Sequence, residues 1–225
     1  MTTWVIGDVH GCAAELADLL GAIGPGRDDR LILCGDLLDK GPDPVGVLRL
    51  LRETGAEAVL GNHDVAVREL GGARLRGEPL SAKPYLIACL DTLEAAGRLE
   101  EAVALCASLP LWVTGEGFRV VHAGLHPTLG TAGTDERLAT TVRAFPPGEP
   151  TAAKWWQQYE GPETIVFGHD ARQGLVVRRE GGRVLAVGLD TGCVYGGALT
   201  AWSPELDRFA SVRAREMWQR PGGPG

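Results

Sequence analysis

Short apolar runs alternate with amphipathic segments through the first 60 residues of the chain. Three of the runs end at or just before a glycine and have the character of buried strands: residues 3–7, 30–35 and 58–60. Two segments between them carry apolar side chains at helical spacing: residues 13–23 and 44–54. This repeated order of strand, loop and helix predicts an α/β fold with parallel strands, whose loops meet beyond the carboxyl ends of the strands.

The rest of the chain is predicted to complete a single domain over residues 1–215. Residues 65–109 look helical and form an expected insert, and two further helices are predicted at 136–145 and 152–159. Strands are expected at several later positions: residues 119–123, 164–168, 175–179, 183–189, 198–203 and 208–213. The closing residues 216–225 end in a run of glycine and proline and are predicted to be a flexible tail.

Composition narrows the class of protein. The 225 residues are 44% hydrophobic and carry a formal net charge of −7, which permits a sizeable core and disfavours nucleic acid as a partner. No apolar run is long enough for a membrane span, and the first residues do not resemble a signal peptide. The five cysteines are widely spaced and odd in number, which is typical of reduced thiols. We therefore expect a cytoplasmic protein without a membrane partner.

Histidines and acids cluster in the turns that follow the predicted strands. Five turns carry them in the order GDVHG, GDLLDKG, GNHD, VHAG and GHD, at residues 7–11, 35–41, 61–64, 121–124 and 168–170. One such turn would mean little, but loops at the carboxyl ends of parallel strands converge on one crevice. Imidazole, carboxylate and carboxamide groups together suit first-row divalent metals such as Mn, Fe and Zn. The sequence therefore predicts a metal centre.

The spacing of the candidate ligands suggests two metal ions. Asp8 and His10 lie two positions apart and can face one ion, while Asp36 has two carboxylate oxygens and can bridge to a second. That second ion would be held by Asn62, His122 and His169. A pair of divalent ions is the usual device for cleaving a phosphoester, because it clamps phosphate oxygens and activates water.

These motifs, in this order, resemble the calcineurin-like metallophosphoesterase superfamily. Together with the segment LDTGCVYGGALTA at 189–201, they resemble most the branch of symmetrical bis(5'-nucleosyl)-tetraphosphatases and serine/threonine protein phosphatases. The resemblance implies a four-layer sandwich of two mixed β-sheets flanked by helices. It also implies two divalent ions, with Mn²⁺ expected and Fe, Zn, Co or Ni open. By the same resemblance, His63 is the catalytic histidine that protonates the leaving oxygen, and Asp39 orients it.

Two cations are candidates for binding the substrate phosphate. Lys40 stands where protein phosphatases usually have arginine, and lysine cannot form a two-pronged contact with phosphate, so protein-phosphatase specificity does not transfer directly. Arg143 is the second candidate, by resemblance to a similar short motif. Asp170 and Asp190 could support metal-bound histidines or serve in turns.

Three functions remain open at this point. The first is symmetrical hydrolysis of dinucleoside polyphosphates, diadenosine tetraphosphate giving two ADP, by a metal-activated hydroxide. The alternatives are a protein phosphatase acting on a phosphoprotein and a catalytically silent metal-binding scaffold. Residues 65–109, which are expected to wall the cleft, would discriminate between the substrates.

Overall fold

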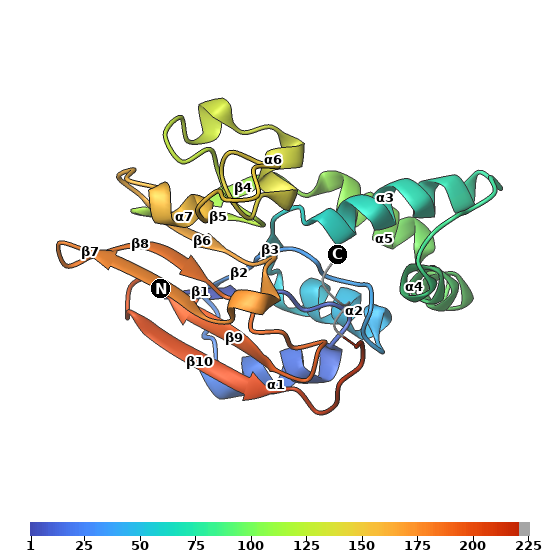
Figure 1. The fold of residues 1–225 in the computed structure, drawn as a ribbon. Helices are drawn as coiled ribbons and strands as arrows, with labels where there is room; N and C mark the ends of the chain where they lie inside the picture. Colours follow the sequence, from blue (N-terminus) through green and yellow to red (C-terminus); the bar gives the residue numbers. More distant parts are fainter. Residues whose placement is uncertain (221–225) are drawn as a thin grey trace.

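The computed structural model describes residues 1–220, and two five-stranded sheets form its centre (Figure 1). The first sheet has the order β10-β9-β1-β2-β3, in which β1, β2 and β3 are parallel, β9 is antiparallel to β1, and β10 is antiparallel to β9. Its strands are β1 (Thr3–Ile6), β2 (Arg30–Leu33), β3 (Glu57–Ala58), β9 (Ala198–Ser203) and β10 (Arg208–Arg213). The predicted repeat of parallel strands and helices is confirmed in this half of the molecule.

The second sheet has the order β4-β5-β6-β8-β7, with β5, β6 and β8 parallel and an antiparallel strand at each edge. Its strands are β4 (Trp112–Thr114), β5 (Phe118–Val121), β6 (Thr164–Phe167), β7 (Val176–Glu180) and β8 (Arg183–Gly188). Both sheets are therefore mixed, as expected. The turn at Gly181 and Gly182, both with positive φ, joins β7 to β8 in a hairpin.

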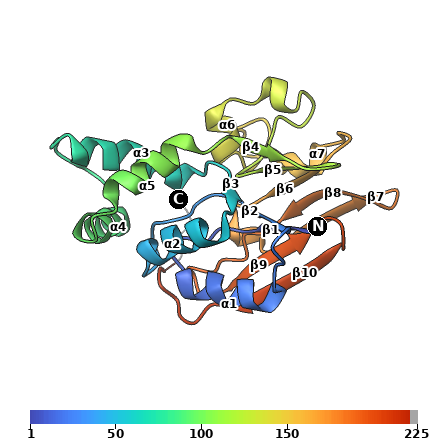
Figure 2. The ribbon, with the colours of Figure 1, turned by 180° about the vertical axis from the view of Figure 1, so that it is seen from behind.

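Helices cover the outer face of each sheet, which makes four layers (Figures 1 and 2). The first sheet is covered by α1 (Ala13–Ile23) and α2 (Pro44–Thr54). The second is covered by the short helices α6 (Glu136–Thr141) and α7 (Trp155–Gln158), with 3₁₀ turns at Thr131–Gly133 and Ala171–Gln173. The predicted four-layer sandwich is confirmed.

Successive side chains of the central strands point to opposite faces of the sheet, and both faces are buried, so these strands are apolar throughout. Val5 of β1 and Ile32 of β2 point into the core between the sheets, together with Val166 of β6. Their neighbours Ile6 and Leu33 point the opposite way, into the core beneath α1 and α2. Because each central strand has a buried face on both sides, both sets of alternate residues must be apolar.

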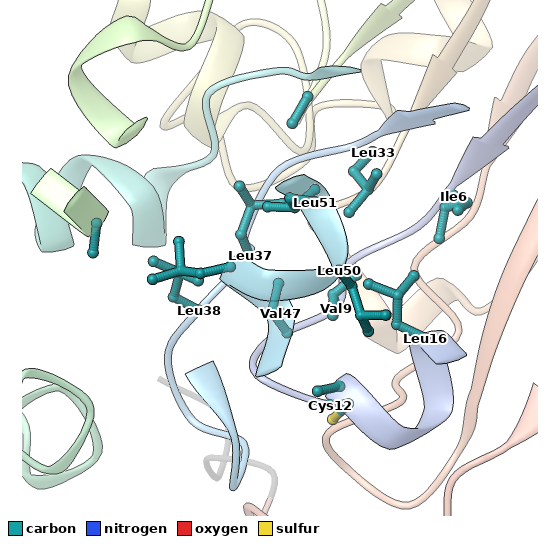
Figure 3. Close-up of a cluster of buried hydrophobic side chains, with 14 of the residues drawn as sticks. Ile6, Val9, Cys12, Leu16, Leu33, Leu37, Leu38, Val47, Leu50 and Leu51 are labelled. Carbon is teal, nitrogen blue, oxygen red and sulfur yellow. The ribbon is translucent and has the colours of Figure 1, made fainter. Parts of the chain in front are cut away.

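The core under the first sheet is the larger of the two outer cores. Figure 3 shows Ile6 and Leu33 packed against Leu16 of α1 and Leu50 of α2, with further side chains from the loops after β1 and β2. Among the latter, Leu37 and Leu38 are almost fully buried and belong to the loop that also carries Asp36. The loop that presents the candidate ligands is thus fixed by apolar anchors.

Three helices occupy the chain between β3 and β4, where the helical insert is predicted. They are α3 (Asn62–Leu75), α4 (Pro84–Ala95) and α5 (Leu99–Ser108), and they project from one end of the sandwich in both views (Figures 1 and 2). Leu90 and Leu93 of α4 are fully buried and extend the core formed with α2. This segment is therefore packed onto the domain through apolar contacts.

Two predicted helices are shorter in the structure, and contacts continue beyond the predicted end of the domain. The predicted helices at 136–145 and 152–159 reduce to α6 and α7; prolines at 146 and 147 follow the first and disfavour helix before them. Trp218 packs against the core under α1, and the Gln219 N–H donates to the Val194 carbonyl at 3.0 Å. The rest of the predicted tail, residues 221–225, lies outside the described residues. Within residues 1–220, no helix has the length and apolar character needed to cross a membrane.

Candidate metal centre

The loops after the parallel strands bring the predicted histidines and acids to one cavity of about 380 Å³. Seven of the predicted site residues line it: His10, Asp36, Lys40, Asn62, His63, Arg143 and His169. The other three, Asp8, Asp39 and His122, are buried and do not line it. The sequence prediction that these turns converge is borne out by the geometry.

Two groups of side chains in this cavity have the geometry to hold a metal ion. In each group one ligand atom of every member lies within 4.8 Å of the others; the groups are His10, Asp36 and His63, and Asp36, His122 and His169. Asp36 belongs to both, which is the placement that a bridging carboxylate requires. The first group differs from the predicted set because it contains His63 in place of Asp8.

Backbone carbonyls fix two of the histidine rings. His122 Nδ1 donates to the Cys34 carbonyl at 2.7 Å, and His169 Nε2 donates to the Thr141 carbonyl at 3.2 Å. The other ring nitrogen therefore carries a lone pair in the neutral ring; that of His122 lies 3.4 Å from Asp36 Oδ1. Burial lowers the pKa of both histidines, so both are held in the neutral form that binds metals.

Buried carboxylates make the cavity suitable for metal cations. Burial, together with the nearby carboxylates of Asp190 and Asp36, raises the pKa of Asp8 well above its ordinary value. Asp8 accepts the backbone N–H of His169 at 3.0 Å, and the ammonium group of Lys40 lies 3.0 Å from His10 Nε2. Buried carboxylates beside free imidazole lone pairs are the donor set of a divalent metal, so the residues present fit the predicted ions.

His63 is held by a buried carboxylate that it shares with His10. Its Nδ1 lies 2.5 Å from Asp39 Oδ2, and His10 Nδ1 lies 2.9 Å from Asp39 Oδ1. Burial alone would lower the pKa of His63, but Asp36 and Asp39 outweigh it and raise that pKa. Burial and the Lys40 ammonium lower the pKa of His10 to about 4. The pKa values of the two rings on one carboxylate are thus shifted in opposite directions.

The loops that line the cavity contain residues with unfavourable, left-handed backbone conformations. Of the five described residues other than glycine with positive φ, four lie at the cavity: His10, Asp36, Lys40 and His169. Left-handed conformations are unfavourable for such residues and persist where surrounding contacts impose them. These contacts include the His10 N–H bond to the Asp36 carbonyl at 2.7 Å, which ties the first two loops together.

The phosphate-binding candidates flank the two ligand groups. Lys40 lies beside the first group, while Arg143 lies near the second, with its Nε 3.6 Å from Asp170 Oδ1. Asp170 is buried and also accepts from Lys154 Nζ at 2.9 Å. Asp170 therefore pairs with the cationic side chains of Arg143 and Lys154 at the edge of the site.

Three residues at or beside the cavity were not assigned a role from the sequence. Arg172 and Tyr195 line the cavity, and Tyr85 of α4 places its ring centroid 5.9 Å from that of His63. Arg172 lies shortly after the GHD turn at 168–170, which was a usable signal. Tyr85 lies in a helix far along the chain, and only the docking of α4 brings it to the site.

The family model for calcineurin-like phosphoesterases matches residues 1–185 of this chain. The chain belongs to that family. It is accordingly a phosphoester or phosphoanhydride hydrolase, and the family implies divalent metal ions at the centre described above.

Relatives and a solved structure extend the comparison across nearly the whole chain. A symmetrical bis(5'-nucleosyl)-tetraphosphatase of Chromohalobacter salexigens is 33% identical, covering 89% of this chain and 94% of that protein. An asymmetrical bis(5'-nucleosyl)-tetraphosphatase, PrpE, of Halalkalibacterium halodurans is 32% identical, covering 94% of both. The crystal structure of a proposed diadenosine tetraphosphatase superimposes with a TM-score of 0.75 at 34% identity, covering 95% of this chain and 93% of that chain.

Proposed function

We propose that this protein hydrolyses dinucleoside polyphosphates symmetrically, converting diadenosine tetraphosphate and water into two molecules of ADP. The observation that carries the proposal is the placement of Lys40 and Arg143 beside different ligand groups of one cavity. Cationic side chains on both sides of the centre can bind a chain of several phosphates, whereas a phosphomonoester has only one phosphate to bind. Relatives named as tetraphosphatases support the same substrate class.

The proposed ligands are Asp8, His10, Asp36, Asn62, His122 and His169, with Asp36 shared. Two divalent cations, when bound there, polarise the phosphate and activate the attacking water. We propose Mn²⁺ as the metal, because mixed imidazole and carboxylate ligands suit it, and Fe, Zn, Co or Ni would use the same donors. Metal analysis of protein purified without chelators, followed by reloading with each ion, tests this choice.

The chain's own groups position the substrate and supply a proton. Lys40 and Arg143 bind phosphate oxygens on the two sides of the reacting phosphorus. Asp39 holds His63 by its Nδ1, which leaves Nε2 to donate a proton to the departing oxygen. In symmetrical cleavage the P–O bond at the central bridging oxygen breaks, the water oxygen bonds to that phosphorus, and the leaving ADP receives the proton from His63.

A substrate panel tests the proposal. The Mn²⁺-loaded enzyme is assayed at equal concentrations of diadenosine tetraphosphate, ATP and a phosphoserine peptide, with the Asp36→Asn variant as the inactive control. We expect kcat/KM to be highest for diadenosine tetraphosphate. Rapid turnover of the phosphopeptide alone would favour a protein phosphatase. No turnover of any of them, with metal bound, would favour the silent scaffold.

We also propose a cytoplasmic location. All five cysteines are free and buried in the structure, which suits a reducing compartment. Fractionation of cells with antibody detection tests the location.

A further inference from the structure

A second cavity of about 430 Å³ adjoins the candidate active site. It lies between the loop that leads into α2 and the first two turns of α4, and its lining includes Pro42, Pro44, Pro84, Tyr85 and Ala88. Lys40 lines both this cavity and the metal-centre cavity. A ligand whose phosphate contacts Lys40 can therefore extend from one cavity into the other.

The lining of the second cavity suits a flat ring. Three prolines and the Tyr85 ring supply apolar surface, and among the described residues that line it Lys40 alone carries a charge. Its volume falls within the range of about 300–1,000 Å³ that is typical of small-molecule sites. Nucleobases stack on aromatic faces, and a purine has both the flat face and the polar edge for such a site. By contrast, a phosphorylated peptide has no general need for a flat apolar pocket.

The position of His63 indicates which half of a substrate would enter the second cavity. The rings of His63 and Tyr85 lie 5.9 Å apart, and the Lys40 ammonium lies 5.9 Å from the Tyr85 centroid. His63 is the proposed proton donor, so the departing half of the substrate leaves past this side of the centre. The nucleoside of that half is then carried past Lys40 toward Tyr85.

We infer that this cavity, named here the Tyr85 cavity, binds the nucleoside of the departing nucleotide, with its base stacked on the Tyr85 ring and its terminal phosphate on Lys40. The inference rests on the proposed function. The Tyr85 cavity would then help to determine the cleavage position. A base bound there sets the number of phosphates between the nucleoside and the phosphorus at the metal centre.

Two alanines of α4 provide a matched test. Ala88 lines the Tyr85 cavity, whereas Ala95 is exposed at the end of the same helix and does not line it. Ala88→Trp fills the cavity, and Ala95→Trp introduces the same side chain elsewhere. We measure kcat/KM for diadenosine tetraphosphate and for p-nitrophenyl phosphate, and separately the Kd of ADP and of pyrophosphate by titration calorimetry. p-Nitrophenyl phosphate and pyrophosphate lack a nucleoside and serve as the reference compounds.

We expect Ala88→Trp to lower the ratio of the two kcat/KM values by about 5- to 100-fold, the range for one stacked base, and to weaken ADP relative to pyrophosphate. Tyr85→Ala should also lower the kcat/KM ratio and weaken the binding of ADP relative to pyrophosphate. Tyr85→Phe should restore both quantities, and Ala95→Trp should match the wild type in both. Equal ratios in Ala88→Trp and Ala95→Trp, with active wild-type enzyme, would overturn the inference alone. Absence of diadenosine tetraphosphate turnover in the wild type would overturn the proposed function and the inference with it.

Discussion

Asp64 accepts the backbone N–H of Asp36 at 2.8 Å. The same buried carboxylate accepts the N–H groups of Leu37 at 2.9 Å and Gly61 at 2.9 Å, so one side chain joins the loop after β2 to the start of α3. The candidate bridging ligand and the adjacent Asn62 and His63 are thereby held together by a residue that does not line the cavity.

The Asp64→Asn variant should lose both stability and metal affinity. The amide group replaces one carboxylate oxygen, and its N–H atoms face backbone donors, so at least one buried N–H loses its partner. Each such loss costs about 1–3 kcal/mol. We expect unfolding by urea at a lower midpoint and weaker Mn²⁺ binding by calorimetry. An Asp91→Asn change on exposed α4 serves as the control, and equal effects in the two variants would contradict this role.

Asp36→Asn should remove at least one of the bound ions. The change replaces a charged oxygen that faces both ligand groups with a neutral amide, while the surrounding contacts remain. We expect fewer ions per chain by elemental analysis, activity lower by several orders of magnitude, and an unchanged circular dichroism spectrum. Retention of the wild-type ion content with near-normal turnover would contradict the bridging assignment.

His63→Ala should lower kcat by about 10²–10⁴, the range for a lost general acid. The loss should be smaller for p-nitrophenyl phosphate, because its leaving group needs little protonation. The six proposed metal ligands remain in place, so the ion content should change little. Equal losses for leaving groups of very different pKa would show that His63 positions substrate instead of donating a proton.

A methyl group at Gly168 should disturb the centre. A Cβ built there would lie 1.8 Å from Asp8 Oδ1, whereas one at Gly21 of α1 meets nothing within 4 Å. We expect Gly168→Ala to weaken metal binding measured by calorimetry. Gly21→Ala should leave metal binding intact and stabilise the protein by about 0.5–1 kcal/mol, since glycine is unfavourable inside a helix. Equal metal affinity in the two variants would contradict the close packing at Asp8.

The clustering of the candidate ligands at the strand ends could be predicted from the sequence, because the fold brings the turns that carry them together. Residues such as Asp8, Asp36 and His169 each follow an apolar strand within a glycine-containing turn, and parallel strands bring such turns together. The pairing of His63 with Asp39 could be inferred only through the family resemblance. Nothing local in the sequence places His10 on the same carboxylate.

Residues brought in by helix docking could not be predicted. Tyr85 reaches the site because α4 packs through Leu90 and Leu93, and the pattern of one helix does not state which loop its first turn will face. Similarly, α6 was predicted four residues too long, because its apolar spacing continues past Thr141 although the backbone has turned extended at Val142. Tertiary contacts decided both outcomes.

The products formed from diadenosine tetraphosphate test the central claim most directly. The Mn²⁺-loaded enzyme is incubated with this substrate, and the nucleotides are separated by anion-exchange chromatography at early times. Symmetrical cleavage predicts ADP alone, at two molecules for each substrate consumed. Equal amounts of ATP and AMP would contradict the proposed cleavage position.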